Sequence, residues 1–431
     1  MASVRRRLNH SGKIETCTKF SITPPTPNRC PCNTTVDDLQ SLMSDNQLSA
    51  EQYTTFCLER IRQVNPYLKA VIEVNPDAVT IAKQLDEERQ KGQIRSKLHG
   101  IPVLVKDNIA SKDRMQTTAG SWALLGSTAP RDAHVVQRLR RAGAVIIGHA
   151  NMSEWASCRS SSYSTGFSSR GDQTRNPYDL TRSPRGSSSD SAVSVSSNIV
   201  PLAFGTETDT SIMGPAMVAG VVGIKPTVGL TSRDGVIPIS KNFDTVGPIG
   251  RTVADAAYAL SAIAGKDDRD LATLSTSRPD DVDYYSQCLA DTTKPKTATF
   301  GLPIKRSWEL VLRSHQQAAE KVFDVITALG ATMEDRYRPS FLGREKSRQM
   351  ARGTADQSEY TVVKVDAYNG INSYLAQLED TSIKTIEDVF EYNLSNAGSE
   401  GGKRGIHHPA FPPGQVRQAL PLASAWSFAT I

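Results

Sequence analysis

Amphipathic helical segments and short apolar segments alternate along the first half of the chain. Ser49 and Gln52 match a capping box, and apolar residues then recur at helical spacing, which predicts a helix. Residues 68–74 alternate and include β-branched side chains, so they predict a strand. A second helix is predicted over residues 75–92, because this segment begins with Asn-Pro and ends at a glycine.

Two further apolar segments have the length of buried strands. The first covers residues 101–105 and ends at Lys106. The second covers residues 144–147 and follows a helical pattern that stops at Gly143. Helices that alternate with short apolar strands indicate an α/β fold.

Residues 159–197 are rich in Ser, Gly and Arg, a composition that linkers share. Ordered-looking apolar segments lie directly before this stretch and after it, at residues 199–204, so we expect it to belong to the fold. Beyond Gly265 helical signals dominate, as over residues 308–329 and at the capping pattern that begins with Thr385.

The pattern predicts a leader followed by one domain. Residues 1–34 contain several prolines and no periodicity, which indicates an extended leader. Residues 35–431 are expected to form a single domain. Within it, residues 416–431 carry little charge and are interpreted as a small packed segment or as an irregular end of the chain.

Composition and charge narrow the class of protein. Basic residues number 50 and acidic residues 45 among 431, and most are interspersed, so the net charge of +5 mainly affects solubility. The arginines at positions 5–7 are interpreted as part of a solvated terminus, and nucleic-acid binding is not expected. No apolar run is long enough to cross a membrane and no apolar signal segment follows these arginines, so we expect a cytoplasmic protein.

Cysteines and histidines do not predict a metal site. The six cysteines are unevenly spaced, which predicts free thiols. Cys30 and Cys32 lack a matching histidine set, and the neighbours His407 and His408 do not share one face of a helix or a strand. Neither a metal nor an organic cofactor is expected.

Three features carry candidate chemistry before any family is considered. Lys106 follows an apolar strand, a place where α/β folds position functional groups, Ser187 lies in a turn, and Ser211 ends a loop of small residues. A serine nucleophile needs a positioned base. No histidine has a recognisable nucleophile context, whereas a lysine serves if burial lowers its pKa from about 10.4 towards neutrality. Composition alone leaves open that Lys106 is a solvated strand-end cation and that the serine loops are ordinary.

Several motifs in one order resemble those of the amidase signature family. They are residues 98–108 around the lysine, Asn-Met-Ser-Glu-Trp at 151–155, Asn-Pro-Tyr at 176–178, the serine motif at 184–191, and the segments 201–206, 211–212 and 220–227. Order and spacing fit from about residue 36 to about residue 414. The resemblance implies an α/β fold with a mixed, twisted central sheet flanked by helices. It also implies hydrolysis of a carboxamide to a carboxylic acid and an amine or ammonia.

Site roles follow from the resemblance residue by residue. Ser211 is expected to be the nucleophile that forms an acyl-enzyme, Ser187 the proton relay after a cis peptide bond, and Lys106 the neutral base. Backbone N–H groups of the loop before the nucleophile are expected to form an oxyanion hole. The expected substrate-binding residues are therefore Ser187, Thr208, Asp209, Thr210 and Ser211.

The sequence departs from the family pattern beside this site. Asp209 and Thr210 stand where Gly-Gly is usual, and glycine adopts conformations that Asp and Thr resist. A carboxylate about 4 Å from the oxyanion would oppose it by roughly 4 kcal/mol at an effective dielectric of 20. Further differences are Arg185, Ser189 and Asp190 in place of usual glycines, and Met213 in place of a frequent arginine. Family members continue further and add closing strands, so the C-terminal part is expected to be shortened.

Three functions remain compatible with these observations. The main prediction is an amidase that acts on a small metabolite or peptide amide, alone or as a homodimer. One alternative is a weak or inactive amidase-like binding protein, which Asp209, Met213 and the short C-terminal part suggest. The other is the ammonia-supplying subunit of a tRNA-dependent amidotransferase, which requires partner subunits.

Overall fold

The computed structural model describes residues 33–159, 163–275, 284–290, 296, 298–301, 311–334 and 359–396. These residues form two compact units. One unit contains the described residues up to Tyr284 and from Val363 onwards, and the other contains those between Tyr285 and Val362. Residues 1–32 of the expected leader and residues 416–431 lie outside the described residues, and the division into a leader and one domain stays a prediction.

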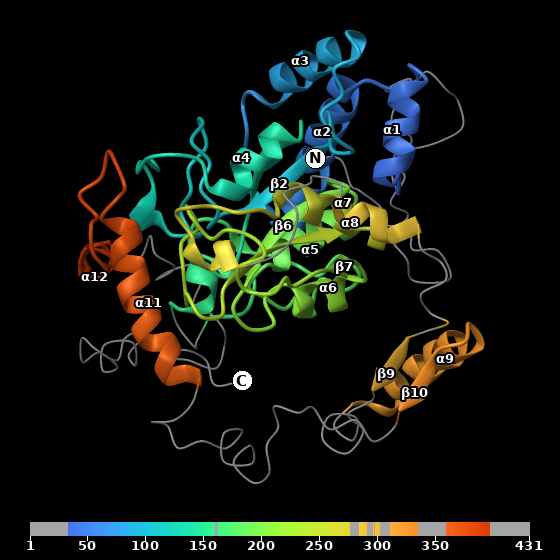
Figure 1. The fold of residues 1–431 in the computed structure, drawn as a ribbon. Helices are drawn as coiled ribbons and strands as arrows, with labels where there is room; N and C mark the ends of the chain where they lie inside the picture. The colour runs from blue at the N-terminus through green and yellow to red at the C-terminus, as the bar shows by residue number, and fades with distance from the viewer. Residues whose placement is uncertain are drawn as a thin grey trace, which may run out of the picture. The chain divides into compact units, whose positions relative to one another are not determined.

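A six-stranded mixed sheet forms the centre of the first unit, in the order β1-β3-β2-β6-β8-β7 (Figure 1). The strands are β1 (Val71–Val74), β2 (Pro102–Lys106), β3 (Val145–Ala150), β6 (Leu202–Glu207), β7 (Val222–Gly223) and β8 (Thr245–Gly250). Strands β3, β2 and β6 are parallel, whereas β1, β7 and β8 join antiparallel. The predicted α/β fold with a mixed central sheet is confirmed.

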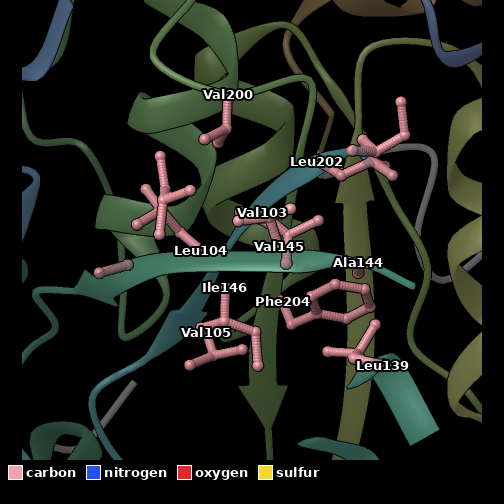
Figure 2. Packing of buried hydrophobic residues seen from close by; sticks show 14 of the residues in the cluster. Val103, Leu104, Val105, Leu139, Ala144, Val145, Ile146, Val200, Leu202 and Phe204 are labelled. Atoms are coloured by element: carbon pink, nitrogen blue, oxygen red, sulfur yellow. The ribbon is translucent and has the colours of Figure 1, made fainter. Parts of the chain in front are cut away.

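The three parallel strands are buried along their whole length. Strands covered on both faces carry continuous rather than alternating apolar side chains, which explains the runs that the sequence shows. Figure 2 shows Val105, Ile146 and Phe204, which come from these three neighbouring strands and belong to one buried cluster. Each such side chain contributes about 1.5–3 kcal/mol when fully buried.

Helices lie before, between and directly after these strands along the chain. They are α1 (Val36–Ser44), α2 (Ala50–Leu68), α3 (Ala78–Gln90), α4 (His134–Arg141), α5 (Ser189–Ser196), α6 (Met213–Ala219) and α7 (Val253–Ile263). Helices α2, α3, α4, α5, α6 and α7 contact strands of the sheet. The capping box predicted at Ser49 and Gln52 is present, because each side chain bonds the other residue's backbone N–H.

Two predicted boundaries near the first strand are wrong by a few residues. Leu68 still belongs to α2, so β1 begins only at Val71. The next helix begins at Ala78 and not at residue 75, because the Asn75 side chain donates to Ile146 O (2.8 Å) and accepts from Asp77 N (2.9 Å). Asn75 therefore ties a turn to β3 instead of starting a helix.

The Ser-rich stretch belongs to the fold where it is described, as predicted. Helix α5 is buried although its sequence is polar. Its small side chains allow close packing, and their hydroxyl groups bond the backbone: Ser191 donates to Phe204 O (3.0 Å) and Ser197 to Val193 O (2.6 Å). Composition alone is a poor guide here, because serine hydroxyls can bond backbone carbonyls of the same helix or of the neighbouring strand.

A second apolar cluster in the first unit gathers around η1 (Trp122–Leu124), η2 (Glu154–Ser157), the part of α11 (Glu359–Leu375) from Val363 onwards, and α12 (Ile386–Ser395). The capping pattern predicted at Thr385 is confirmed as a capping box with Asp388. Short elements complete this unit: β4 (Phe167–Ser168), β5 (Asp172–Gln173) and η3 (Leu271–Ser275).

The second unit contains two parallel strands, β9 (Thr299–Gly301) and β10 (Thr332–Glu334), and the helix α9 (Arg313–Ala328). Helix α9 confirms the helix predicted over residues 308–329 within its described part. The short helices α8 (Tyr284–Gln287) and η4 (Cys288–Ala290) lie at the start of this region. Within the described part of the chain, no helix has the length and apolar character needed to cross a membrane.

Candidate active site

Parallel strands bring the candidate base to one edge of the sheet. Lys106 is the last residue of β2, and the neighbouring strand β6 ends at Glu207. Parallel strands have their carboxyl ends at the same edge, where α/β folds commonly bind ligands. The Lys106 side chain is completely buried, so the interpretation as a solvated strand-end cation is wrong.

Four oxygen atoms surround the amino group of Lys106. Nζ lies 2.7 Å from Ser187 Oγ, 3.0 Å from Ser188 Oγ, 2.8 Å from Thr206 Oγ1 and 3.3 Å from Thr206 O. All four belong to uncharged groups, and Ser188 Oγ itself donates to Thr206 O (2.9 Å). Among the described residues, the amino group is therefore bonded by hydroxyl and carbonyl oxygens and by no carboxylate.

Burial lowers the pKa of Lys106 to about 7. Desolvation disfavours the charged ammonium and outweighs the opposing effect of the carboxyl groups of Asp190, Asp244 and Glu207, which favour the ammonium when they are ionised. A lysine in this state is partly neutral near neutral pH and can accept a proton, whereas an exposed lysine is almost wholly protonated there.

The turn that carries Ser187 is packed tightly against the same edge. The Gly186–Ser187 peptide bond is cis, as the resemblance implies, and Ser187 is 1% exposed. Ser187 O accepts from Ser153 N (3.2 Å). A Cβ atom at residue 186 would lie 2.5 Å from Ser153 Oγ, so any other residue there would force the Ser153 side chain to move.

Ser211 lies next to this turn through a backbone hydrogen bond. Ser188 N donates to Ser211 O (3.0 Å), which brings the three predicted catalytic residues together. Ser211 Oγ is partly exposed, and among the described residues its hydrogen bond is a long one to Asp209 O (3.5 Å). Glu207 Oε2 accepts from Ile212 N (2.5 Å) and Met213 N (2.9 Å), so strand β6 fixes the start of α6 directly after Ser211.

Comparison with known proteins decides the family. The family model described as Amidase matches residues 52–411. The chain belongs to the amidase family. A Schizosaccharomyces pombe protein named as an amidase is 49% identical over 386 residues, which are 88% of this chain and 66% of that protein. The chain thus spans just under two thirds of the length of that relative.

Two solved structures show how far the likeness extends. The native peptide amidase from Stenotrophomonas maltophilia is 40% identical with a TM-score of 0.77, over 87% of this chain and 74% of that one. A glutamyl-tRNA(Gln) amidotransferase subunit from Thermotoga maritima is 28% identical with a TM-score of 0.61, over 84% of this chain and 70% of that one. The amidase fold predicted from the sequence is therefore confirmed.

Two of the unusual residues of this amidase-family chain, Asp209 and Thr210, lie in the loop before Ser211. Thr210 has φ = +63°, in the left-handed region that a β-branched residue adopts only with strain. Asp209 is exposed, and its carboxylate accepts from Thr210 Oγ1 (2.9 Å). Thr208 Oγ1 donates to Asp244 Oδ1 (2.5 Å). Among the described residues, the backbone N–H groups of residues 209–211 donate to no acceptor, which leaves them available to a ligand.

Asp190, another departure from the family pattern, is a buried carboxyl group near the base. Thr174 Oγ1 donates either to Lys69 O (2.7 Å) or to Asp190 Oδ1, with which it is in close hydrogen-bond contact. Burial raises the pKa of Asp190 well above its usual range, which agrees with a neutral acid. Its other oxygen, Oδ2, accepts from Ser189 Oγ (2.6 Å).

Sequence reasoning assigned no role to Ser188, Thr206, Asp244 and Cys158, which the structure places around Lys106. Ser188 and Thr206 lie inside the motifs at residues 184–191 and 201–206. The resemblance therefore offered a reason to expect both residues near Lys106. Asp244 and Cys158 are buried, and burial raises the pKa of both groups. Nothing in the local sequence around them points to the site.

Cysteines and metal ligands add no further centre in the described chain. Cys57 and Cys158 are buried free thiols and Cys288 is an exposed one, whereas Cys30, Cys32, His407 and His408 lie outside the described residues. Within the described ranges, no group of three His, Cys, Asp or Glu side chains is placed to hold a metal ion.

Proposed function

We propose that this chain is an amidase that hydrolyses carboxamides through an acyl-enzyme on Ser211. The observation that carries the proposal is the buried Lys106 amine, 2.7 Å from Ser187 Oγ. With a pKa of about 7, about half of these amines are neutral at neutral pH. Neutral Lys106 is then a general base for a serine hydroxyl.

Acylation moves one proton along the three side chains. Ser211 Oγ attacks the carbonyl carbon and gives its proton to Ser187 Oγ, while Ser187 gives its own proton to Lys106 Nζ. The oxyanion accepts hydrogen bonds from the backbone N–H groups of residues 208–211. The C–N bond then breaks, the leaving nitrogen takes the proton from Ser187, and Ser187 recovers one from Lys106. Water attacks the ester by the same route, which releases the carboxylic acid and restores Ser211.

One rotation prepares the nucleophile. Ser211 Oγ points to Asp209 O at 3.5 Å, a contact at the limit of a hydrogen bond, so turning towards Ser187 costs little. Long catalytic contacts in a ligand-free site commonly tighten when substrate binds.

Small metabolite or peptide amides are the proposed substrates. The likeness to the peptide amidase, at 40% identity and a TM-score of 0.77, supports this class. The likeness to the amidotransferase protein is lower on both measures, at 28% and 0.61, so a role in an amidotransferase has weaker support.

A fluorophosphonate probe tests the proposal on the purified chain. We expect a covalent adduct on Ser211, found by peptide mass spectrometry and absent in Ser211→Ala. A folded protein that is not labelled would show that the hydrolase proposal is wrong. Labelling that needs added partner subunits would favour the amidotransferase role.

The second candidate is an amidase-like binding protein with little turnover. The left-handed Thr210 favours it, because strain beside the nucleophile can displace the oxyanion donors. This candidate predicts that the protein binds amides but labels slowly, and that Thr210→Gly restores labelling.

A further inference from the structure

Asn108 carries a buried hydrogen-bond acceptor without a donor in the described part of the chain. The residue is 2% exposed and follows Lys106 by two positions. Its Oδ1 atom is buried and has no partner among the described residues. Buried polar atoms nearly always meet a protein group, an ordered water or a ligand, so this oxygen requires an explanation.

The orientation of the Asn108 amide is fixed by its nitrogen. Nδ2 donates to Thr206 Oγ1 (3.1 Å) and faces Ile237 O (3.4 Å). A carbonyl oxygen only accepts, so Nδ2 and not Oδ1 must face Ile237. Ile237 N also donates to Asn108 O (2.9 Å), which holds the two segments together. Oδ1 therefore points away from both partners.

Asn108 is linked to the base through one hydroxyl group. Thr206 Oγ1, which accepts from Asn108, also lies 2.8 Å from Lys106 Nζ. Two small cavities meet at Asn108. One is lined by polar groups that include Thr206, Thr208 and Asp244, and the other by apolar groups that include Met152 and Trp155. Asn108 is thus joined to the base through Thr206, and it lines one cavity together with Thr208 of the loop that leads to Ser211.

We propose that Asn108 Oδ1 accepts a hydrogen bond from the N–H group on the scissile nitrogen of the substrate. This inference rests on the proposed amidase function and narrows its substrate class to primary and secondary carboxamides. An ester of the same acyl group has no N–H and leaves the buried acceptor unpaired. A site built to bond a donor rejects analogues that lack it, which makes Asn108 a specificity-determining residue.

A matched amide and ester test this role. N-acetylleucine amide and N-acetylleucine methyl ester share the acyl group and differ at the leaving atom. Asn108→Leu keeps the size of the side chain but removes both hydrogen-bonding atoms. We expect kcat/KM for the amide to fall about tenfold or more beyond any fall for the ester, because only the amide loses a buried partner.

Asn108→Leu also removes the hydrogen bond from Nδ2 to Thr206 Oγ1, and Thr206→Val is the control for that loss. It removes the hydroxyl that Asn108 and Lys106 share, while Oδ1 stays in place. This variant is expected to lower amide and ester turnover by the same factor. An equal fall for both substrates in Asn108→Leu would overturn the inference, because Oδ1 would then face only water.

A binding measurement separates this inference from the proposed function. In Ser211→Ala protein, which cannot form the ester bond, Trp155 lines the cavity beside Asn108 and supplies a fluorescence signal. We expect the amide to bind about tenfold more tightly than the ester, and Asn108→Leu in this background to remove the preference. If wild-type protein hydrolyses neither compound but this preference is found, the function fails and the inference stands. Equal binding of both compounds in the Ser211→Ala protein overturns the inference whatever the turnover.

Discussion

The half of the site that holds the base and the half that holds the nucleophile are built in opposite ways. Lys106 is completely buried, and its amino group lies within 3.3 Å of four oxygens from a strand end and a helix start. Ser211 is partly exposed and sits in a loop whose preceding residue has a left-handed backbone. Regular structure therefore pre-organises the base, whereas the nucleophile depends on the local conformation of a few residues. Sequence changes in this loop should alter activity without unfolding the protein.

Removing the base should have the largest effect. Lys106→Met replaces the amine with an apolar side chain of similar length, which suits the buried pocket. We expect kcat/KM to fall about 10²–10⁴-fold, the usual contribution of a positioned general base. Steady-state kinetics measures the loss, and a thermal melt close to that of the wild type shows that the fold is intact. A loss smaller than about tenfold would mean that another group takes the proton.

The state of the base should also appear in the pH dependence. Burial lowers the pKa of Lys106 to about 7, so its neutral fraction grows as pH rises towards that value. Log kcat/KM is expected to rise by about one per pH unit below pH 7 and to level off above it. A profile measured from pH 5 to pH 9 tests this, with circular dichroism at each end as the control. A rise centred near pH 10 would indicate an ordinary exposed lysine.

The same contrast explains what the sequence predicts well. The buried strand before Lys106 and the capping box at Ser49 follow from local patterns, so their elements were predicted almost to the residue. The place of Lys106 at a strand end also follows from the apolar run before it. By contrast, the unpaired oxygen of Asn108 and the neutral acid Asp190 depend on groups distant in sequence, such as Ile237 and Thr174. No local pattern reports such contacts.

The nucleophile half should respond to relief of backbone strain. Thr210 has φ = +63°, and glycine adopts this region without a steric penalty. Thr210→Gly is expected to raise the free energy of unfolding by about 1 kcal/mol. The backbone N–H groups that bind the oxyanion then reach their positions with less strain. Fluorophosphonate labelling of Ser211 should therefore become a few-fold faster.

Arg185→Gly is the matched control for this prediction. Arg185 also has a left-handed backbone, at φ = +59°, but lies on the side of the relay serine and is not β-branched. We expect it to stabilise the protein without changing the labelling rate. Equal acceleration in both variants would show that general stability, and not the loop before Ser211, limits labelling.

The smallest effect is expected at Asp190, although it is buried near the base. Burial raises the pKa of Asp190 well above its usual range, which favours the protonated acid, and asparagine likewise offers one donor beside Thr174 and one acceptor for Ser189 Oγ. Asp190→Asn should therefore change kcat/KM by less than about threefold and leave the pH profile in place.

Difference infrared spectra should show the carbonyl band of a protonated carboxyl group in the wild type and not in the variant. If Asp190 were instead ionised, the substitution would remove a negative charge that favours the ammonium form of Lys106 and would shift the rise in activity to lower pH. A shift in that direction would show that Asp190 titrates beside Lys106. The hydrogen bonds around Lys106 would then not fix the protonation state of the base by themselves.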